Sequence, residues 1–229
     1  MPAIMEILRA IRSIGLGSTL QTVRYAMQRD RSERRLLKRE RPALVIQPGK
    51  LNEYHLIDNG ARYSFAHAEV ELKFLATNLV RITWQPGALP LPYALAKTEW
   101  PVVELETHDR GISSSQIEVV VSEDGDLTFL DAAGELLRKE IAPSCQGESW
   151  SIQSDLATDE HVYGLGDRAS PLNLRGGTYR MWSTDPGGSY GLDDDPLYLN
   201  IPAYLSLHSR GSSLIFYENS FDGSFHVDD

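Results

Sequence analysis

The residues best suited to chemistry lie in a glycine-rich stretch, residues 175–198, that is loaded with aspartate, tyrosine and tryptophan. Carboxylates accept paired hydrogen bonds from neighbouring hydroxyl groups, and aromatic faces cover the apolar face of a sugar ring. This composition predicts carbohydrate binding. Three aromatic side chains could serve either as sugar platforms or in packing, and we interpret them first as packing residues: Trp182, Tyr190 and Tyr198.

Two other kinds of site are less well supported in the same region. Gly164-Leu165-Gly166 resembles part of a nucleotide-binding loop, but the sequence lacks the third glycine and the following helix. We expect these glycines to let a bent backbone pass close to a neighbouring strand, and Asp167 and Arg168 to pin the loop through ion pairs. The triplet Asp193 to Asp195 lacks the alternating spacing and the bidentate glutamate of a helix-loop-helix calcium site. A solvated loop or salt bridges explain the triplet better, so we expect no metal and no cofactor.

The elements that must position these residues are strands. From residue 43 onward, large apolar residues alternate with polar ones, as a half-buried strand requires. The predicted strands are 70–74, 80–84, 117–121, 127–129, 179–181, 201–207 and 214–217, with turns at 77–78 and 123–126. Short strands interrupted by Gly, Pro and Asp about every ten residues predict a mainly β fold, an antiparallel β-sandwich.

Residues 1–42 differ in charge from the rest of the chain. They carry a net charge of +6, whereas residues 43–229 carry −16. Apolar residues recur at three- and four-residue spacing, which favours two short amphipathic helices with a break at residues 15–17, before Pro42 ends the segment. Such a basic helix could touch anionic lipid or RNA. We favour a solvated helix that docks on the acidic body or on a partner subunit, since no tryptophan or aromatic belt accompanies it. We therefore predict two parts, a basic helical extension (1–42) and a β-sandwich domain (43–229).

Composition excludes several classes of protein. The chain has 229 residues and a net charge of −10, which disfavours nucleic acid as a partner. No apolar run is long enough to span a membrane, and charges at Glu6, Arg9 and Arg12 interrupt any signal-peptide core. The only cysteine, Cys145, excludes an internal disulfide framework. These features predict a cytoplasmic location.

The string from His161 to Leu207 closely resembles the N-terminal domain of glycoside hydrolase family 31, the α-glucosidase and α-xylosidase family. The resemblance rests on Tyr-Gly-Leu-Gly-Asp-Arg (163–168), Trp-Ser-Thr-Asp (182–185) and Asp-Asp-Pro-Leu-Tyr with Ile-Pro (194–202). A weaker similarity, which includes Leu79 to Ile82, extends over roughly residues 45–229. Residues 1–42 fall outside it.

The resemblance implies a galactose mutarotase-like sandwich placed ahead of a catalytic (β/α)8 barrel. In such retaining enzymes two barrel aspartates, about 5–5.5 Å apart, act as nucleophile and acid/base. The residues after His161 offer no strand and helix alternation for a barrel of about 250 residues. We therefore interpret the sequence as a fragment that lacks both catalytic aspartates and is inactive alone. The resemblance also gives Asp185 a substrate-binding role, on a loop over the barrel mouth that helps to hold the sugar beyond the cleaved bond. The expected partner is an α-glucoside oligosaccharide.

Other interpretations remain open. An Asp-Pro-Gly turn stabilised by its own side chain would give Asp185 a purely local role. The domain could be a stand-alone carbohydrate-binding module, or less plausibly an aldose mutarotase, which needs a glutamate and a histidine converging on the sugar. An apolar sandwich face left uncovered by the missing barrel would allow a homo-oligomer to form.

Overall fold

The computed structural model describes residues 11–13, 15–36, 43–85, 94, 96–97, 99–185, 190–192 and 194–229, and divides the chain into two compact units, Met1–Leu44 and Val45–Asp229. The first unit contains helix α2 (Leu16–Leu36), which begins directly after Gly15, where φ is +83°. The earlier of the two predicted helices falls mainly on residues 1–10, which lie outside the described residues. Within the described ranges, no helix has an apolar run that could cross a bilayer.

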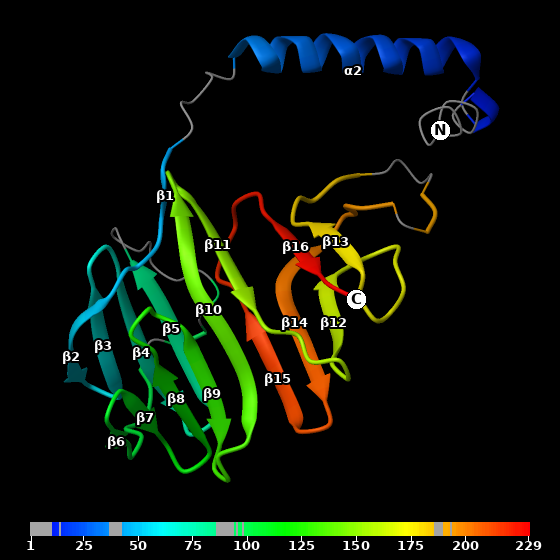
Figure 1. Cartoon of the computed structure of the whole chain (residues 1–229). Coiled ribbons are helices and arrows are strands. Elements are labelled where there is room, and N and C mark those ends of the chain that lie inside the picture. The colour runs from blue at the N-terminus through cyan, green and yellow to red at the C-terminus, as the bar shows by residue number, and fades with distance from the viewer. Residues whose placement is uncertain are drawn as a thin grey trace. The chain divides into compact units, whose positions relative to one another are not determined.

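The second unit consists of strands (Figure 1). One sheet has the order β2 (Leu51–Ile57), β3 (Gly60–Phe65), β4 (Glu69–Ala76), β5 (Leu79–Gln85). A second has the order β1 (Val45–Ile46), β10 (Leu136–Gln146), β9 (Leu127–Asp131), β8 (Ile117–Val121), β7 (Gly111–Ser113), β6 (Glu106–His108), and β11 (Ser149–Ser154) also pairs with β10. A third contains β12 (His161–Gly166), β14 (Asn200–His208) and β15 (Gly211–Phe216), while β13 (Gly177–Arg180) pairs with β16 (Ser224–Val227). Every pairing is antiparallel, which confirms the predicted mainly β, antiparallel fold.

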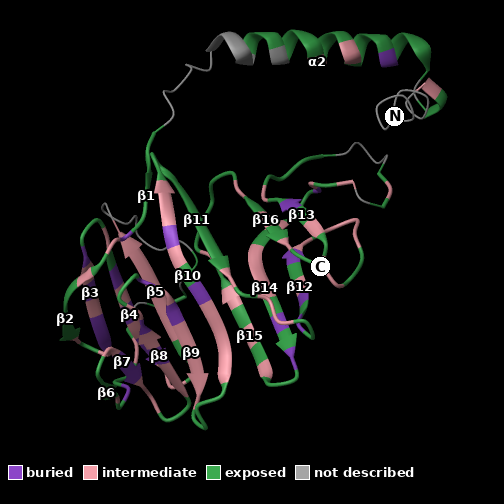
Figure 2. Ribbon diagram, in the orientation of Figure 1, coloured by how far each residue is buried: buried purple, intermediate pink, exposed green. Residues whose placement is uncertain are grey.

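The first two sheets form the sandwich and enclose the main core. Alternate residues of β3 and β4 point inward and meet alternate residues of β7, β8 and β9. The buried side chains are Ala61, Tyr63, Phe65, Val70, Leu72 and Phe74 from one sheet and Ile112, Val119, Val121 and Leu127 from the other. Figure 2 shows the buried positions spaced along these strands. The period-two pattern in the sequence is therefore the pattern of this core.

The predicted turns also occur where the sequence places them. Residues 77–78 connect β4 to β5, and Gly125, at φ +94°, turns the chain between β8 and β9. A side chain added at Gly125 would meet the Trp84 ring at 3.3 Å, so glycine also serves the packing beneath the hairpin.

A second, smaller cluster lies under β12, β13 and β14, where the buried residues are Val162, Leu165, Leu174 and Tyr179. The His208 Nε2–H donates to the Leu137 carbonyl at 3.1 Å and so joins β14 to the long strand β10. The opposite face of β14 and β15 is apolar yet exposed. Leu205, Leu207, Leu214 and Phe216, which we call the outer apolar face, share one side of these strands because Leu205 pairs directly with Leu214.

Candidate functional site

The chemistry-bearing residues converge on the connection between β13 and β14, residues 181–199, which we call the Asp185 loop. Its two arms lie against each other. The Thr184 N–H donates to the Leu197 carbonyl at 2.9 Å, and the Asn200 side-chain amide donates to the Ser183 hydroxyl at 3.3 Å. Residues 186–189 and Asp193 lie outside the described residues, and so does most of the Asp-Pro-Gly turn expected after Asp185.

A largely buried ion pair fixes the base of the loop. The Arg168 side chain is only 3% exposed and pairs with the Asp195 carboxylate, which is 18% exposed. The same guanidinium donates to the backbone carbonyls of Leu165 and Arg180, and the second Asp195 oxygen accepts the Arg180 N–H at 2.7 Å. This confirms the expected pinning role of Arg168. Asp167 contributes differently, through its backbone N–H, which donates to the Leu199 carbonyl at 2.8 Å.

The two glycines of the Gly-Leu-Gly motif allow a close approach between β12 and the end of the loop. Gly164 and Gly166 adopt φ values of +130° and +90°. A Cβ atom would lie 2.7 Å from the Ala203 carbonyl oxygen at the first position and 2.3 Å from the Leu199 carbonyl oxygen at the second. The expectation that these glycines serve a close backbone passage is confirmed. Leu165, between them, buries its side chain in the second cluster.

Two residues of the aspartate triplet, Asp194 and Asp195, make contacts within the domain. Asp195 is in the ion pair with Arg168, and Asp194 accepts a hydrogen bond from the Gly191 N–H at 2.5 Å. Salt bridging is one of the two expected explanations of this triplet, and Asp195 forms such a bridge with an arginine of this chain. The described residues contain no group of three or more His, Cys, Asp or Glu arranged to hold a metal ion.

Asp185 itself lies on the exposed end of one arm and is bonded to the other arm. The Tyr198 hydroxyl donates to Asp185 Oδ1 at 2.7 Å. That hydrogen bond, followed by partial burial, raises the pKa of the Tyr198 phenol above its ordinary value, so the group stays a donor at neutral pH. The sequence carried no signal for this pair, because the two residues are thirteen positions apart in a loop without periodicity.

The aromatic residues of the loop are not packing residues of this domain's own core. Trp182 is 52% exposed, Tyr190 53% and Tyr198 52%, so these residues lie outside the two buried clusters, and their interpretation as packing residues stays a prediction. Trp182 lies under the Arg180 guanidinium, 5.7 Å from its ring centroid, and Arg180 is in turn held by both oxygens of Asp222. This second ion pair is exposed on both sides.

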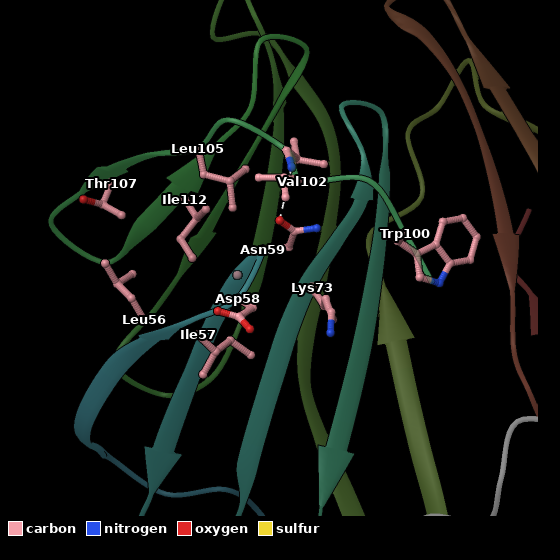
Figure 3. A pocket seen from close by; sticks show the side chains of 12 residues that line it. Leu56, Ile57, Asp58, Asn59, Lys73, Trp100, Val102, Leu105, Thr107 and Ile112 are labelled. Carbon is pink, nitrogen blue, oxygen red and sulfur yellow. Dashed lines mark hydrogen bonds between the residues drawn. The ribbon is translucent and has the colours of Figure 1, made fainter. Parts of the chain in front are cut away.

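The domain also has a hollow away from this loop. It measures about 600 Å³ and opens beside the turn between β2 and β3. Figure 3 shows Leu56, Leu105 and Ile112 around it, with Trp100 at its far end. The Asn59 side chain holds residues 101–103 beside the hollow. It donates to the Pro101 carbonyl and accepts from the Val103 N–H. The hollow shares no lining residue with the Asp185 loop.

Among the described residues, neither this hollow nor a second one is lined by the histidine that the acid/base pair of a mutarotase requires. The His–Glu approach within 4 Å in the described ranges is that of His108 and Glu106, both exposed on β6. His208 has both ring nitrogens engaged, one with the Leu137 carbonyl and one with the Arg210 N–H. His161 is bonded to the Asn173 side chain. The histidines that the sequence places on strands are hydrogen-bonded, structural residues.

Comparison with known proteins identifies relatives of this domain. Residues 69–226 match the family described as the glycosyl hydrolase 31 N-terminal galactose mutarotase-like domain. Alpha-glucosidase 2 of Bacillus thermoamyloliquefaciens is 28% identical over 211 residues, which cover 81% of this chain and 27% of that protein. An alpha-glucosidase of Saccharolobus solfataricus is 30% identical over 82 residues, 36% of this chain and 12% of that protein.

Among solved structures, a GH31 dextranase mutant of Flavobacterium johnsoniae in complex with isomaltotriose superposes with a TM-score of 0.68 at 25% identity. The match covers 79% of this chain and 24% of the dextranase chain. The chain therefore spans about a quarter of the length of Alpha-glucosidase 2 and of the dextranase.

Proposed function

The chain belongs to the glycosyl hydrolase 31 family through its N-terminal galactose mutarotase-like domain, and we propose that it is the non-catalytic domain of an α-glucosidase-type enzyme. The Asp185 loop lends a carboxylate to a substrate site whose reacting groups lie outside these residues. The observation that carries this proposal is the exposed Asp185 carboxylate at the end of a loop that a buried ion pair and cross-arm hydrogen bonds hold in place.

The proposed role of Asp185 is to bind substrate without taking part in bond cleavage. An ionised carboxylate accepts strong hydrogen bonds from hydroxyl groups, and a fixed one holds the sugar beyond the cleaved bond in a single orientation. The cleavage itself, which we propose to proceed with retention, needs two carboxylates on a barrel. The substrate we propose is an α-glucoside oligosaccharide, which is supported by the dextranase relative bound to isomaltotriose. This chain alone is then inactive.

We also propose that the outer apolar face supports that barrel. Leu214 is 75% exposed and Phe216 46% exposed on one side of β15, an arrangement that soluble monomers seldom leave in contact with water. The relatives carry about three quarters of their length beyond the matched region, so they supply a domain large enough to cover it. Residues 1–42 are proposed as a separate basic extension, and the cytoplasmic location stays a prediction.

The test of the Asp185 role uses the full-length protein that carries this domain. For Asp185→Asn we expect kcat/KM on an α-linked glucose disaccharide to fall by about 10- to 100-fold, the effect of losing a charged hydrogen-bond acceptor. An aryl α-glucoside has no sugar beyond the cleaved bond, so its kcat/KM should change by less than about 3-fold. Asp194→Asn, on the same loop, is the matched control. Unchanged kinetics on both substrates would remove Asp185 from the site.

A stand-alone carbohydrate-binding module is the second candidate, and the half-exposed Trp182, Tyr190 and Tyr198 favour it. The two functions differ in what this chain does alone. A binding module would bind a gluco-oligosaccharide without the barrel, with a Kd measurable by calorimetry. The proposed domain would show no saturable binding at millimolar sugar, because Asp185 supplies only part of the site.

A further inference from the structure

An exposed aspartate is a poor orienting group unless something restricts its side chain. Asp185 precedes residues outside the described ranges and lies in no strand or helix. A freely rotating carboxylate would lose side-chain conformational entropy when it binds a sugar, whereas a carboxylate that is already held in place is oriented before binding. One group that restricts it is on the opposite arm of the loop, where the Tyr198 hydroxyl donates to Asp185 Oδ1 at 2.7 Å.

Tyr198 is itself carried by the most firmly anchored part of the loop. Its neighbour Leu197 is only 2% exposed, and the Leu197 carbonyl accepts from the Thr184 N–H at 2.9 Å and from the Asn200 side chain at 3.2 Å. Two residues before Leu197, Asp195 closes the ion pair with Arg168. The phenol therefore projects from a fixed backbone, and the first of these bonds ties that backbone to the residue just before Asp185.

We propose that Tyr198 is a positioning residue for Asp185, whose hydroxyl holds the carboxylate in the orientation that accepts hydrogen bonds from the sugar beyond the cleaved bond. This inference rests on the proposed role of Asp185. Tyr198 acts through Asp185 and takes no part in bond cleavage. Its half-exposed ring leaves the pair open to solvent, where an oligosaccharide hydroxyl can reach the carboxylate.

The protonation states fit this arrangement at neutral pH. The donor must keep its proton and the acceptor must be ionised. Because the hydrogen bond to the Asp185 carboxylate raises the pKa of the phenol, the hydroxyl remains protonated well above neutral pH. The pair therefore does not change its direction of donation across the range in which a cytoplasmic glycosidase would work.

The experiment is a double-mutant cycle in the full-length protein, with Tyr198→Phe, Asp185→Asn and the double variant assayed on an α-linked glucose disaccharide and on an aryl α-glucoside. For Tyr198→Phe we expect a loss of about 3- to 10-fold in kcat/KM on the disaccharide, as for one neutral hydrogen bond. On the aryl glucoside the change should stay within about 2-fold. The double variant should match Asp185→Asn within about 2-fold, because the hydroxyl has no further effect once its acceptor is altered.

Tyr54→Phe is the matched control, since it removes another exposed tyrosine hydroxyl bond, the one to the Asp109 carbonyl in the sandwich. This variant should leave kcat/KM on both substrates unchanged. Melting temperatures of all variants show whether a loss reflects unfolding, which would lower activity on both substrates alike.

The outcomes separate the two proposals. No effect of Asp185→Asn on the disaccharide overturns the proposed function and this inference with it. A loss for Asp185→Asn with none for Tyr198→Phe overturns only the positioning role. Losses that multiply in the double variant also overturn it, because Tyr198 would then act on the sugar directly. Equal losses on both substrates for Tyr198→Phe would make the tyrosine merely structural.

Discussion

Two regions of the domain differ in how far they bury their apolar residues: the sandwich formed by β1 to β11, and the region from β12 to β16. In the sandwich, large side chains such as Tyr63, Leu72 and Phe74 are fully buried between two sheets. The later region has a smaller cluster and leaves Leu192 and Leu214 more than 70% exposed. It fixes its loop mainly with ion pairs and backbone hydrogen bonds.

This difference indicates that the two regions of the domain have different structural roles. The sandwich gains its stability from its own packing. The later region carries apolar side chains that gain free energy only if another surface covers them, together with a loop that is held at its base and exposed at its end. The first region is a support, and the second is arranged for contact.

The largest effect that tests this comparison comes from one substitution made in both regions. Leu72→Ala should lower the free energy of unfolding of this chain by about 2–5 kcal/mol, because it leaves a cavity in a packed core. Leu214→Ala, on an exposed strand position, should change it by less than about 0.5 kcal/mol. Urea unfolding followed by tryptophan fluorescence measures both.

Leu214→Ala also sharpens the comparison in the full-length protein. If the outer apolar face is covered in the full-length protein, the substitution should lower the melting temperature of that protein. In this chain alone the melting temperature should stay unchanged. If the face instead joins two copies of this chain, Leu214→Ala should shift a dimer toward monomer in sedimentation. Equal losses for Leu72→Ala and Leu214→Ala in this chain alone would contradict the division between the regions.

A second, smaller effect compares the two ion pairs of the loop-bearing region. Asp195→Ala should cost about 3 kcal/mol, because it leaves the buried Arg168 charge without its carboxylate, and the partial exposure of Asp195 keeps the loss at the low end. Asp222→Ala breaks a pair that water already screens and should cost far less. Chemical unfolding at pH 7 gives both values. A larger loss for Asp222→Ala would mean that the exposed pair, not the buried one, holds the loop.

The smallest effect is a pH dependence. The hydrogen bond from Arg180 lowers the pKa of Asp222 below its ordinary value. Partial desolvation of the Asp222 carboxylate acts in the opposite direction, and the positive charge of Arg180 lowers the pKa further. A carboxylate with a depressed folded-state pKa adds stability above its unfolded pKa of about 3.9, and this is lost as pH falls through the folded value. Asp222→Asn should therefore be less stable than the wild type at pH 7 and should converge with it below pH 4. Arg180→Gln, which removes the partner, should flatten the same curve, and parallel curves would contradict the assignment.

Much of the fold could be predicted because its signals are local. The alternation in residues 70–74 and 117–121 marks the sandwich strands, since neighbouring side chains of a strand point to opposite faces. Among the missed strands, β6 and β7 have only three residues each, and β2 has interrupted apolar residues. Strand β3 was missed although Ala61, Tyr63 and Phe65 do alternate with polar residues. The helix α2 runs unbroken to Leu36 through a strongly charged stretch, where the sequence favoured shorter helices.

The loop was predictable in type but not in geometry. Its aspartates and aromatic residues, and the resemblance they carry, pointed to carbohydrate and to Asp185. Nothing in the spacing showed that Arg168 would reach Asp195, or that the aromatic residues would be half exposed. The turn chemistry at Gly125 depends on its own φ angle and could be predicted, whereas these contacts join loop residues that are distant in the sequence.

What the amino-acid sequence determined by itself is therefore many of the strands, the antiparallel class and the family of the domain. Tertiary structure alone decided which charges meet, which leucines remain in water, and which hydroxyl reaches Asp185. The physical reason is the separation along the chain over which each interaction acts. Backbone preference and side-chain alternation act between adjacent residues, while an ion pair or a 2.7 Å hydrogen bond across a loop exists only after β12, β13 and β14 have brought its ends together.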